Sequence, residues 1–318
     1  MLGDWALILG GLVLLGGGGE ALVRGAVGLA RSFRVTPAVI GLTVVAAGTS
    51  MPELVVSVMA ALRGSPDIAA ANVIGSNIFN LGLVLGLTSL ILVLPVESTT
   101  LKWEWPFLLL VSMVTAVLMR DGHLGRAEGS LFLFALVAFL AVMVRMARGE
   151  VRRREASAPT VLPPGADPGE GGWFKHGAIL AAGCTLVVFG GKLVVDGATG
   201  IALAAGLSER MVGLTIVAMG TSLPELASSL VAAARGRSDV AVGNLVGSSI
   251  FNLLGILGVG ASLVPLQVDP ALVHQDLLWM LALTLFLAPL IYPRRRLGRI
   301  EGFLLLGVFT IYMLQLIF

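Results

Sequence analysis

The sequence predicts an all-α polytopic membrane protein, with about ten transmembrane helices in two inverted five-helix repeats. Three observations carry this prediction. The 318-residue chain is 57% hydrophobic and only 13% charged, whereas a soluble domain carries about 25% charged residues. Apolar stretches of transmembrane length recur along the whole chain, and a polar motif of the first half returns in the second half.

Charged residues, prolines and glycines divide the apolar sequence into stretches of about 20 residues, the length that crosses a hydrocarbon core of about 30 Å. These stretches predict spans at residues 5–30, 36–62, 68–94, 104–120, 127–147, 174–206, 210–234, 240–265, 275–292 and 300–317. The residues before the first stretch lack the basic region and the cleavage site of a signal peptide. We therefore expect this stretch to be a retained helix.

A hydrophilic segment separates the two halves. We expect residues 1–148 to form the first repeat, residues 149–173 a linker and residues 174–318 the second repeat. The linker is rich in arginine, proline and glycine and is too short for a folded domain. Most lysines and arginines fall on the linker's side of the predicted spans. The positive-inside rule therefore predicts a multi-pass protein of the cell (inner) membrane, with both termini outside and the linker in the cytoplasm.

The internal repeat relates residues that are 172 positions apart. GLTVVAAGTSMPE at Gly41–Glu53 matches GLTIVAMGTSLPE at Gly213–Glu225, and GSNIFNL at Gly75–Leu81 matches GSSIFNL at Gly247–Leu253. A shared hydrophobic bias cannot explain the match, because the matching residues include the polar ones. Each half holds an odd number of predicted spans, so the second half enters the membrane in the opposite sense. Many secondary transporters have this arrangement.

The repeated Gly-Thr-Ser-X-Pro-Glu segment predicts a broken helix in the second and seventh spans. Pro52 has no N–H to donate to the carbonyl group of Gly48, and its ring opens that turn. The freed carbonyl groups must find protein, water or an ion, because lipid cannot bind them. The polar side chains that share one face around the two breaks are Thr49, Ser50, Glu53, Thr221, Ser222 and Glu225.

Two more polar stripes lie on the third and eighth spans. Their members, spaced four residues apart, are Asn72, Ser76, Asn80, Asn244, Ser248 and Asn252. If the two halves cross, the four stripes meet near the middle of the membrane. Carboxylate, hydroxyl, amide and carbonyl oxygens are hard ligands that suit Na⁺ and Ca²⁺. Ionisable residues at this depth are costly and mark functional sites, so we expect a cation site built around Glu53 and Glu225.

Charged residues also occupy matched positions in the first and sixth spans. Glu20 and Arg24 are four residues apart, as are Lys192 and Asp196 with the signs exchanged. This spacing predicts an ion pair within each helix. We expect these pairs to be structural, with a role in gating as the alternative.

Other functions remain to be weighed against cation exchange. A Ca²⁺/H⁺ antiporter, or one for another divalent cation, could use the same glutamates, and Na⁺ dependence at fixed pH separates the two hypotheses. A passive channel does not require a dense central site in inverted repeats. An intramembrane hydrolase with Ser50 or Ser249 as nucleophile would need a histidine or lysine base at membrane depth, and metalloprotease spacing is missing.

We therefore expect a transporter, with no enzyme activity and no cofactor. The net charge of +2 gives no reason to expect a nucleic-acid partner. The single cysteine, Cys184, excludes a disulfide within the chain. The sequence does not indicate an oligomeric state.

The segments GLTVVAAGTSMPEL and GLTIVAMGTSLPEL, followed by NVIGSNIFN and NLVGSSIFN, resemble the paired alpha-repeats of the sodium/calcium exchanger family, within the cation/calcium antiporters. The resemblance covers essentially the whole chain. It implies Na⁺ and Ca²⁺ as transported ions, alternating access by sliding of spans one and six, and ion sites between spans two, three, seven and eight. The ligands that it implies are the carbonyl groups of Ala46 and Ala218 and the side chains of Thr49, Ser50, Glu53, Ser76, Asn80, Thr221, Ser222, Glu225, Ser248 and Asn252.

This chain departs from some members of the family at Asn252, where they have an aspartate. The departure leaves two acidic ligands, so we expect no potassium co-transport. It also leaves the number of Na⁺ ions per cycle open. The chain lacks the large cytoplasmic calcium-sensing region of animal exchangers, and we expect no comparable regulation.

Overall fold

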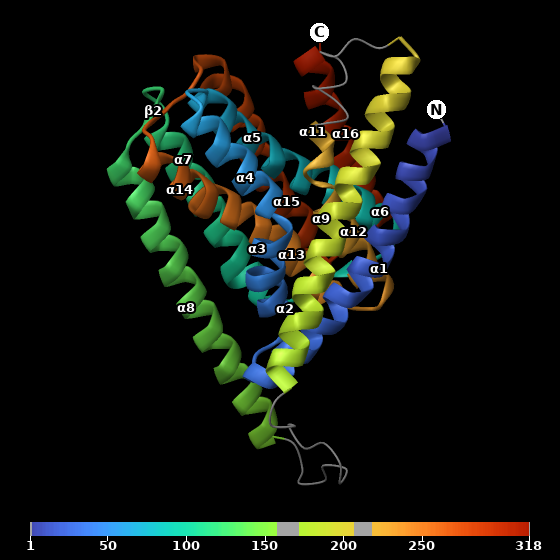
Figure 1. The fold of residues 1–318 in the computed structure, drawn as a ribbon. Helices are drawn as coiled ribbons and strands as arrows, with labels where there is room; N and C mark the ends of the chain where they lie inside the picture. Colours follow the sequence, from blue (N-terminus) through green and yellow to red (C-terminus); the bar gives the residue numbers. More distant parts are fainter. Residues whose placement is uncertain (1, 158–171, 207–217, 318) are drawn as a thin grey trace.

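The computed structural model describes residues 2–157, 172–206 and 218–317. These residues form a bundle of helices with two short pairs of strands (Figure 1). Within the described residues, eight helices are long and apolar enough to cross a membrane, and a bent pair of helices supplies a ninth span. The prediction of an all-α membrane fold is confirmed. Residues 210–217 of the predicted seventh span lie outside the described residues.

The first half of the chain runs from α1 to α8. Its helices are α1 (Leu2–Phe33), α2 (Pro37–Ile40), α3 (Ala46–Thr49), α4 (Met51–Leu62), α5 (Pro66–Ile78), α6 (Leu85–Ile91), α7 (Trp105–Leu118) and α8 (Arg126–Ser157). Three π-helical segments complete the second, third and fourth spans, and these are Gly41–Val45, Phe79–Val84 and Thr100–Glu104. Helix α8 continues into the segment that was predicted as linker.

The second half repeats this order. Its helices are α9 (Gly172–Ala204), α11 (Ala218–Gly220), α12 (Leu223–Ala234), α13 (Ser238–Ile250), α14 (Leu257–Leu263), α15 (Leu277–Ile291) and α16 (Arg299–Ile317). Its π-helical segments, Phe251–Ile256 and Leu272–Asp276, match two of the first half. Such segments are rare and are frequent at functional sites. The sequence analysis did not predict them.

Two short strand pairs connect the halves. Strand β1 (Leu94–Pro95) pairs antiparallel with β4 (Arg296–Leu297), and β2 (His123–Leu124) pairs antiparallel with β3 (Leu266–Gln267). Each pair therefore contains one strand from each half. Strands β1 and β3 occupy matched positions in the two repeats, so the partners are exchanged as expected for inverted halves.

Helices α1 and α9 lie side by side along one flank of the bundle (Figure 1). Their backbones approach closely. A Cβ atom added at Gly18 would lie 2.8 Å from Cβ of Leu186, and one at Gly190 would lie 2.9 Å from the carbonyl oxygen of Gly11. Small residues permit this close helix packing in membranes. The start of α1 and the end of α16 lie at one end of the molecule, while the end of α8 and the start of α9 lie at the other (Figure 1).

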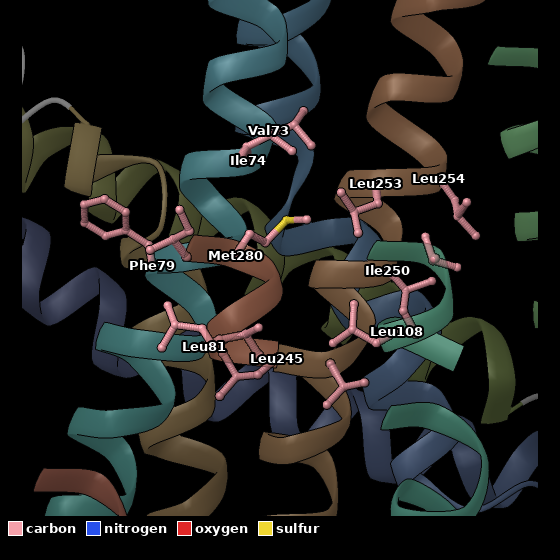
Figure 2. Close-up of a cluster of buried hydrophobic side chains, with 14 of the residues drawn as sticks. Val73, Ile74, Phe79, Leu81, Leu108, Leu245, Ile250, Leu253, Leu254 and Met280 are labelled. Carbon is pink, nitrogen blue, oxygen red and sulfur yellow. The ribbon is translucent and has the colours of Figure 1, made fainter. Parts of the chain in front are cut away.

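The centre of the bundle is formed by the third and eighth spans. In the eighth span, Ser238–Leu263, 94% of the most apolar stretch is buried, and in the third span, Pro66–Ile91, the share is 72%. In the other unbroken spans only 28% to 39% of the most apolar stretch is buried. Ile74, Leu245 and Met280 all belong to the large buried apolar cluster at this centre (Figure 2). The two central spans are therefore shielded by the outer helices, whose exposed apolar side chains suit contact with lipid.

Candidate ion-binding site

The two Gly-Thr-Ser-X-Pro-Glu segments form matched helix breaks. The two parts of the second span are inclined to each other by 46°. The break falls at Ser50, which has φ −84° and ψ 10°, and Ser222 has nearly the same backbone, with φ −88° and ψ 2°. Pro52 and Pro224 lie in the first turn of the helix that follows, where a missing N–H is tolerated. The predicted break is confirmed, and each glutamate lies at the start of a new helix.

Glu53 and Glu225 approach each other from opposite halves of the chain. Each is 1% exposed. Ser50 donates a hydrogen bond of 2.9 Å to Oε1 of Glu225, which connects the two breaks directly. Atom Oε2 of each glutamate is buried and has no hydrogen-bond partner in the described part of the chain. Two buried carboxylates in this arrangement are unfavourable by themselves, and a cation between them would stabilise both.

Buried polar atoms without a partner concentrate at the predicted site. Of nine such side-chain atoms among the described residues, seven belong to predicted ligands. These seven atoms belong to Glu53, Asn80, Thr221, Ser222, Glu225, Ser248 and Asn252. Nearly all buried polar groups in proteins have a hydrogen-bond partner. A cluster of buried oxygen atoms without partners therefore indicates a bound species that these oxygens contact. A cation, which several oxygen atoms can coordinate at once, fits this description.

The remaining predicted ligands differ in whether their oxygen atoms already take part in hydrogen bonds. Thr49 is fully buried, and its hydroxyl oxygen lies 3.1 Å from the carbonyl oxygen of Val45. The carbonyl group of Ala46 already accepts the N–H of Ser50 at 3.0 Å, so an ion would use its second lone pair. Ser76 is 5% exposed on α5. Ala218 is the first residue of α11, and nothing beyond its backbone is described.

Two asparagines of the polar stripes connect neighbouring helices. Asn72 donates to the hydroxyl oxygen of Ser57 at 2.9 Å. Its counterpart Asn244 donates to the hydroxyl oxygens of Ser228 at 2.9 Å and Ser229 at 3.2 Å. The amide nitrogens therefore point toward α4 and α12, and these side chains hold the broken helices against the central spans.

Asn77 was not singled out from the sequence. It is 1% exposed, and its side-chain oxygen lies 3.4 Å from the amide nitrogen of Asn252. The internal repeat could not identify it, because its counterpart in the second half is Ser249. The sequence feature that could have identified Asn77 is its position directly after Ser76, within the polar stripe of the third span.

The site contains few charges for its number of oxygen atoms. In the described ranges, no group of three or more His, Cys, Asp or Glu side chains is arranged to hold a metal ion. A bound cation would therefore meet two carboxylates and a majority of neutral oxygens. That mixture suits Na⁺ and Ca²⁺ better than soft transition metals.

Comparisons with known proteins identify the family of the chain. The family model described as sodium/calcium exchanger protein matches residues 3–145 and 175–318. A protein of Alkalimonas amylolytica named CaxA is 40% identical over 98% of each chain. The sodium/calcium exchanger MaX1 of Methanosarcina acetivorans is 29% identical over 99% of each chain.

A solved structure extends the similarity to three dimensions. The sodium-calcium exchanger NCX_Mj, in crystals soaked with zero Na⁺ and Ca²⁺, superposes with a TM-score of 0.84 at 33% identity and covers 99% of both chains. Family, fold and chain length thus agree from end to end. The chain belongs to the sodium/calcium exchanger protein family and is a multi-pass membrane antiporter of cations.

Proposed function

We propose that this protein exchanges Na⁺ for Ca²⁺ across the membrane by alternating access. The ions bind in the middle of the membrane, between the second, third, seventh and eighth spans. The observation that carries the proposal is the facing pair of buried glutamates, Glu53 and Glu225, each with an unpaired carboxylate oxygen. The proposed ligands are those named from the sequence: Ala46, Thr49, Ser50, Glu53, Ser76, Asn80, Ala218, Thr221, Ser222, Glu225, Ser248 and Asn252.

The charge of the site explains how exchange is coupled. With both glutamates ionised the site carries about −2, which one Ca²⁺ or two to three Na⁺ neutralise. Both ions compete for the same oxygen atoms, so binding of one excludes the other. An unneutralised pair of carboxylates resists movement through hydrocarbon. Competition and neutralisation together give obligatory exchange instead of leak.

The neutral oxygen atoms favour Na⁺ over H⁺ as the coupling ion. Proton exchange requires only the two carboxylates, whereas Thr221, Ser222 and Ser248 add buried hydroxyl oxygens without partners among the described residues. Hydroxyl and amide oxygens give Na⁺ its coordination shell. MaX1 and NCX_Mj, which resemble this chain over nearly its whole length, are both named sodium/calcium exchangers.

We also propose an orientation in the membrane. Both termini lie outside the cell (inner) membrane, and the linker within residues 149–173 lies in the cytoplasm between repeats 1–148 and 174–318. The ends of α1 and α16 at one end of the molecule, opposite the α8 and α9 ends, support this topology (Figure 1). The concentration of arginines on the linker side supports its direction.

The decisive experiment is ⁴⁵Ca²⁺ uptake into proteoliposomes at clamped pH. Vesicles loaded with Na⁺ are compared with identical vesicles loaded with K⁺ or choline. We expect uptake only with internal Na⁺. Uptake that ignores Na⁺ but follows a proton gradient would show a Ca²⁺/H⁺ antiporter, and uptake without any opposing gradient would show a channel.

A further inference from the structure

We propose that Asn77, which lies outside the predicted ligand set, is a positioning residue for Asn252. It fixes the side-chain amide of Asn252 so that the oxygen of this amide, and not its nitrogen, faces the ions. The proposal rests on the proposed function, because it concerns the binding of the same cations. Asn77 thus influences ion affinity without touching the ion.

Three side chains from three spans form a directed row of contacts. Asn77, at the end of α5, donates its amide N–H to the sulfur atom of Met280 on α15, at 3.6 Å. Asn252 in turn donates its amide N–H to the side-chain oxygen of Asn77, at 3.4 Å. The side-chain oxygen of Asn252 is buried and has no partner among the described residues.

The direction of the row follows from the chemistry of its first member. A thioether sulfur accepts hydrogen bonds weakly and cannot donate one, so the amide group of Asn77 turns its nitrogen toward Met280. Its oxygen is then left for Asn252, which must offer its own nitrogen. The oxygen of Asn252 therefore points away from Asn77, and it is the atom left free to bind a cation.

Burial prevents the row from reversing. Asn77 and Asn252 are each 1% exposed and Met280 is fully buried. Met280 lies in the central apolar cluster, among side chains of the third and eighth spans (Figure 2). An amide N–H group that turned away from its acceptor would therefore not reach bulk water as a replacement acceptor. Rotation of the Asn252 amide by about 180° would place two N–H groups toward the cation and two oxygens against each other, which is unfavourable in a site of low dielectric.

The proximity of Asn252 to the glutamates follows from its neighbour. Ser248 lies about one turn earlier on the same side of the eighth span. Helix α13, which carries Ser248, packs against helix α12, which carries Glu225, and both side chains have a buried oxygen atom without a partner among the described residues. Asn252 is therefore placed to supply a neutral oxygen beside a charged one.

The internal repeat offers a matched control. Ser249 is the counterpart of Asn77, is fully buried, and donates to the carbonyl oxygen of Leu245 in its own helix at 3.0 Å. It does not orient Asn80, the counterpart of Asn252. A serine at position 77 is compatible with this fold, because the second half carries serine there. Its short side chain would bond to its own helix as Ser249 does, and would not reach Asn252.

The test is a double-mutant cycle on ion binding. Purified wild type and the variants Asn77→Ser, Asn252→Ala and the double variant are heated in detergent over a range of Ca²⁺ and, separately, Na⁺ concentrations. Partners in the outer shell of metal sites contribute roughly 10-fold to 100-fold to affinity. We therefore expect Asn77→Ser to raise the concentration of at least one ion that gives half-maximal stabilisation by about tenfold. The melting temperature without ions serves as the measure of folding.

The cycle distinguishes positioning from a general structural role. In the Asn252→Ala background there is no amide to orient, so Asn77→Ser should not shift the half-maximal concentration further. Ser249→Ala shares no hydrogen-bond partner with the proposed ligands and should leave both ion responses within about twofold of wild type. An equal shift from Asn77→Ser in both backgrounds would overturn the proposal, because Asn77 would then act independently of Asn252.

The same data separate this proposal from the proposed function. If wild type responds to neither ion, the Na⁺/Ca²⁺ function itself is wrong. If wild type responds and Asn77→Ser responds at unchanged concentrations, only the role of Asn77 is wrong. A parallel measurement of Na⁺-dependent ⁴⁵Ca²⁺ uptake should show, for Asn77→Ser, a raised half-saturating concentration of the same ion whose stabilising concentration is raised, with a maximal rate close to that of wild type.

Discussion

The two halves of the molecule carry almost the same motif and yet make different contacts with it. Ser50 donates to Glu225, whereas its counterpart Ser222 has no partner among the described residues. Helix α1 packs against α12 and is connected to its end by the ion pair of Glu20 and Arg235. The counterpart of Arg235, Arg63, is exposed and is not part of an ion pair in the described part of the chain.

This difference separates the contacts that the repeated motif determines from those that depend on how the two halves are arranged in this structure. A contact that is present in both halves follows from the repeated sequence. A contact that is present in one half only marks an asymmetric arrangement of the two repeats. If the halves exchange roles during alternating access, contacts of the second kind are the ones that change. The following predictions separate the two kinds.

The largest effect is expected at the two glutamates, which the motif places in both halves. Glu53→Gln or Glu225→Gln removes one of two negative charges from the site, and the affinity of oxygen sites for Ca²⁺ depends strongly on the number of charged ligands. We expect each variant to reduce Na⁺-dependent ⁴⁵Ca²⁺ uptake by roughly 100-fold or more. Melting curves without ions control for folding. If either variant folds and exchanges ions at the full rate, the glutamate that it lacks is not required for exchange. The two halves would then not contribute equally to ion binding.

The next effect concerns the asparagines that connect the broken helices to the central spans. Asn244 donates to two hydroxyl groups, and its side-chain oxygen lies 3.3 Å from the hydroxyl oxygen of Thr49, whose single hydrogen it shares with the carbonyl oxygen of Val45 at 3.1 Å. Asn72 donates to Ser57 and to the backbone carbonyl group of Glu53. Each buried hydrogen bond contributes about 1 kcal/mol. We expect both alanine variants to be destabilised, with Asn244→Ala about 1 kcal/mol less stable than Asn72→Ala.

Chemical denaturation in detergent without ions measures this difference. Ser249→Ala is the control, because its hydroxyl group bonds only within its own helix. Equal losses of stability for Asn72→Ala and Asn244→Ala would show that the contact from Thr49 contributes nothing. The asymmetry at this point would then have no energetic consequence.

Serine at the helix breaks gives a smaller and more specific effect. Ser50→Ala removes the donor to Oε1 of Glu225, so the ion-free protein should lose about 1 kcal/mol of stability. Ser222→Ala removes a hydroxyl group without a partner and should leave the ion-free stability unchanged. Both variants should weaken ion binding, because both serines are proposed ligands. Equal ion-free stabilities would contradict the structural difference between the two breaks.

The sequence predicted the fold and the composition of the site because both depend on local rules. Span limits follow from apolar length, so the predicted span 240–265 differs only slightly from the observed span Ser238–Leu263. The break before Glu53 follows from the missing N–H of Pro52. The intrahelical pairs Glu20–Arg24 and Lys192–Asp196 follow from their spacing and are present, at 2.6 Å and 2.5 Å.

The remaining features depend on packing between segments that are distant in sequence. The π-helical segments insert a wider turn that an uninterrupted apolar run does not reveal. The strands are only two residues long, so they carry no alternating pattern. Three contacts require knowledge of how the two halves cross: that of Thr49 with Asn244, that of Asn77 with Asn252 and that of Arg235 with Glu20. A repeat in the sequence predicts which residues match, but not which of them meet.

The smallest effect is expected at the ion pair of Glu20 and Arg235, which has no matching pair among the described residues of the other half. Arg235 Nε lies 2.6 Å from Oε2 of Glu20, and the two side chains are 58% and 23% exposed. Such partly exposed pairs contribute no more than about 1 kcal/mol after solvent screening. The counterpart of Glu20 in the repeat is Lys192, so the symmetric arrangement would bring Arg63 toward a residue of like charge where Arg235 meets a carboxylate. The pair of Glu20 and Arg235 should therefore favour the arrangement seen here over its counterpart.

Glu20→Gln tests whether this pair distinguishes the two end states. Because apparent affinity depends on the fraction of molecules that face a given side, the ratio of half-saturating Ca²⁺ concentrations on the two sides should change by up to about fivefold. Right-side-out and inverted membrane vesicles measure the two sides separately. Asp196→Asn is the matched control, since it removes a carboxylate whose pair lies within α9. An equal change in both variants would mean that surface charge alone is responsible, whereas a change confined to Glu20→Gln would identify the contact between α1 and α12 as specific to one end state.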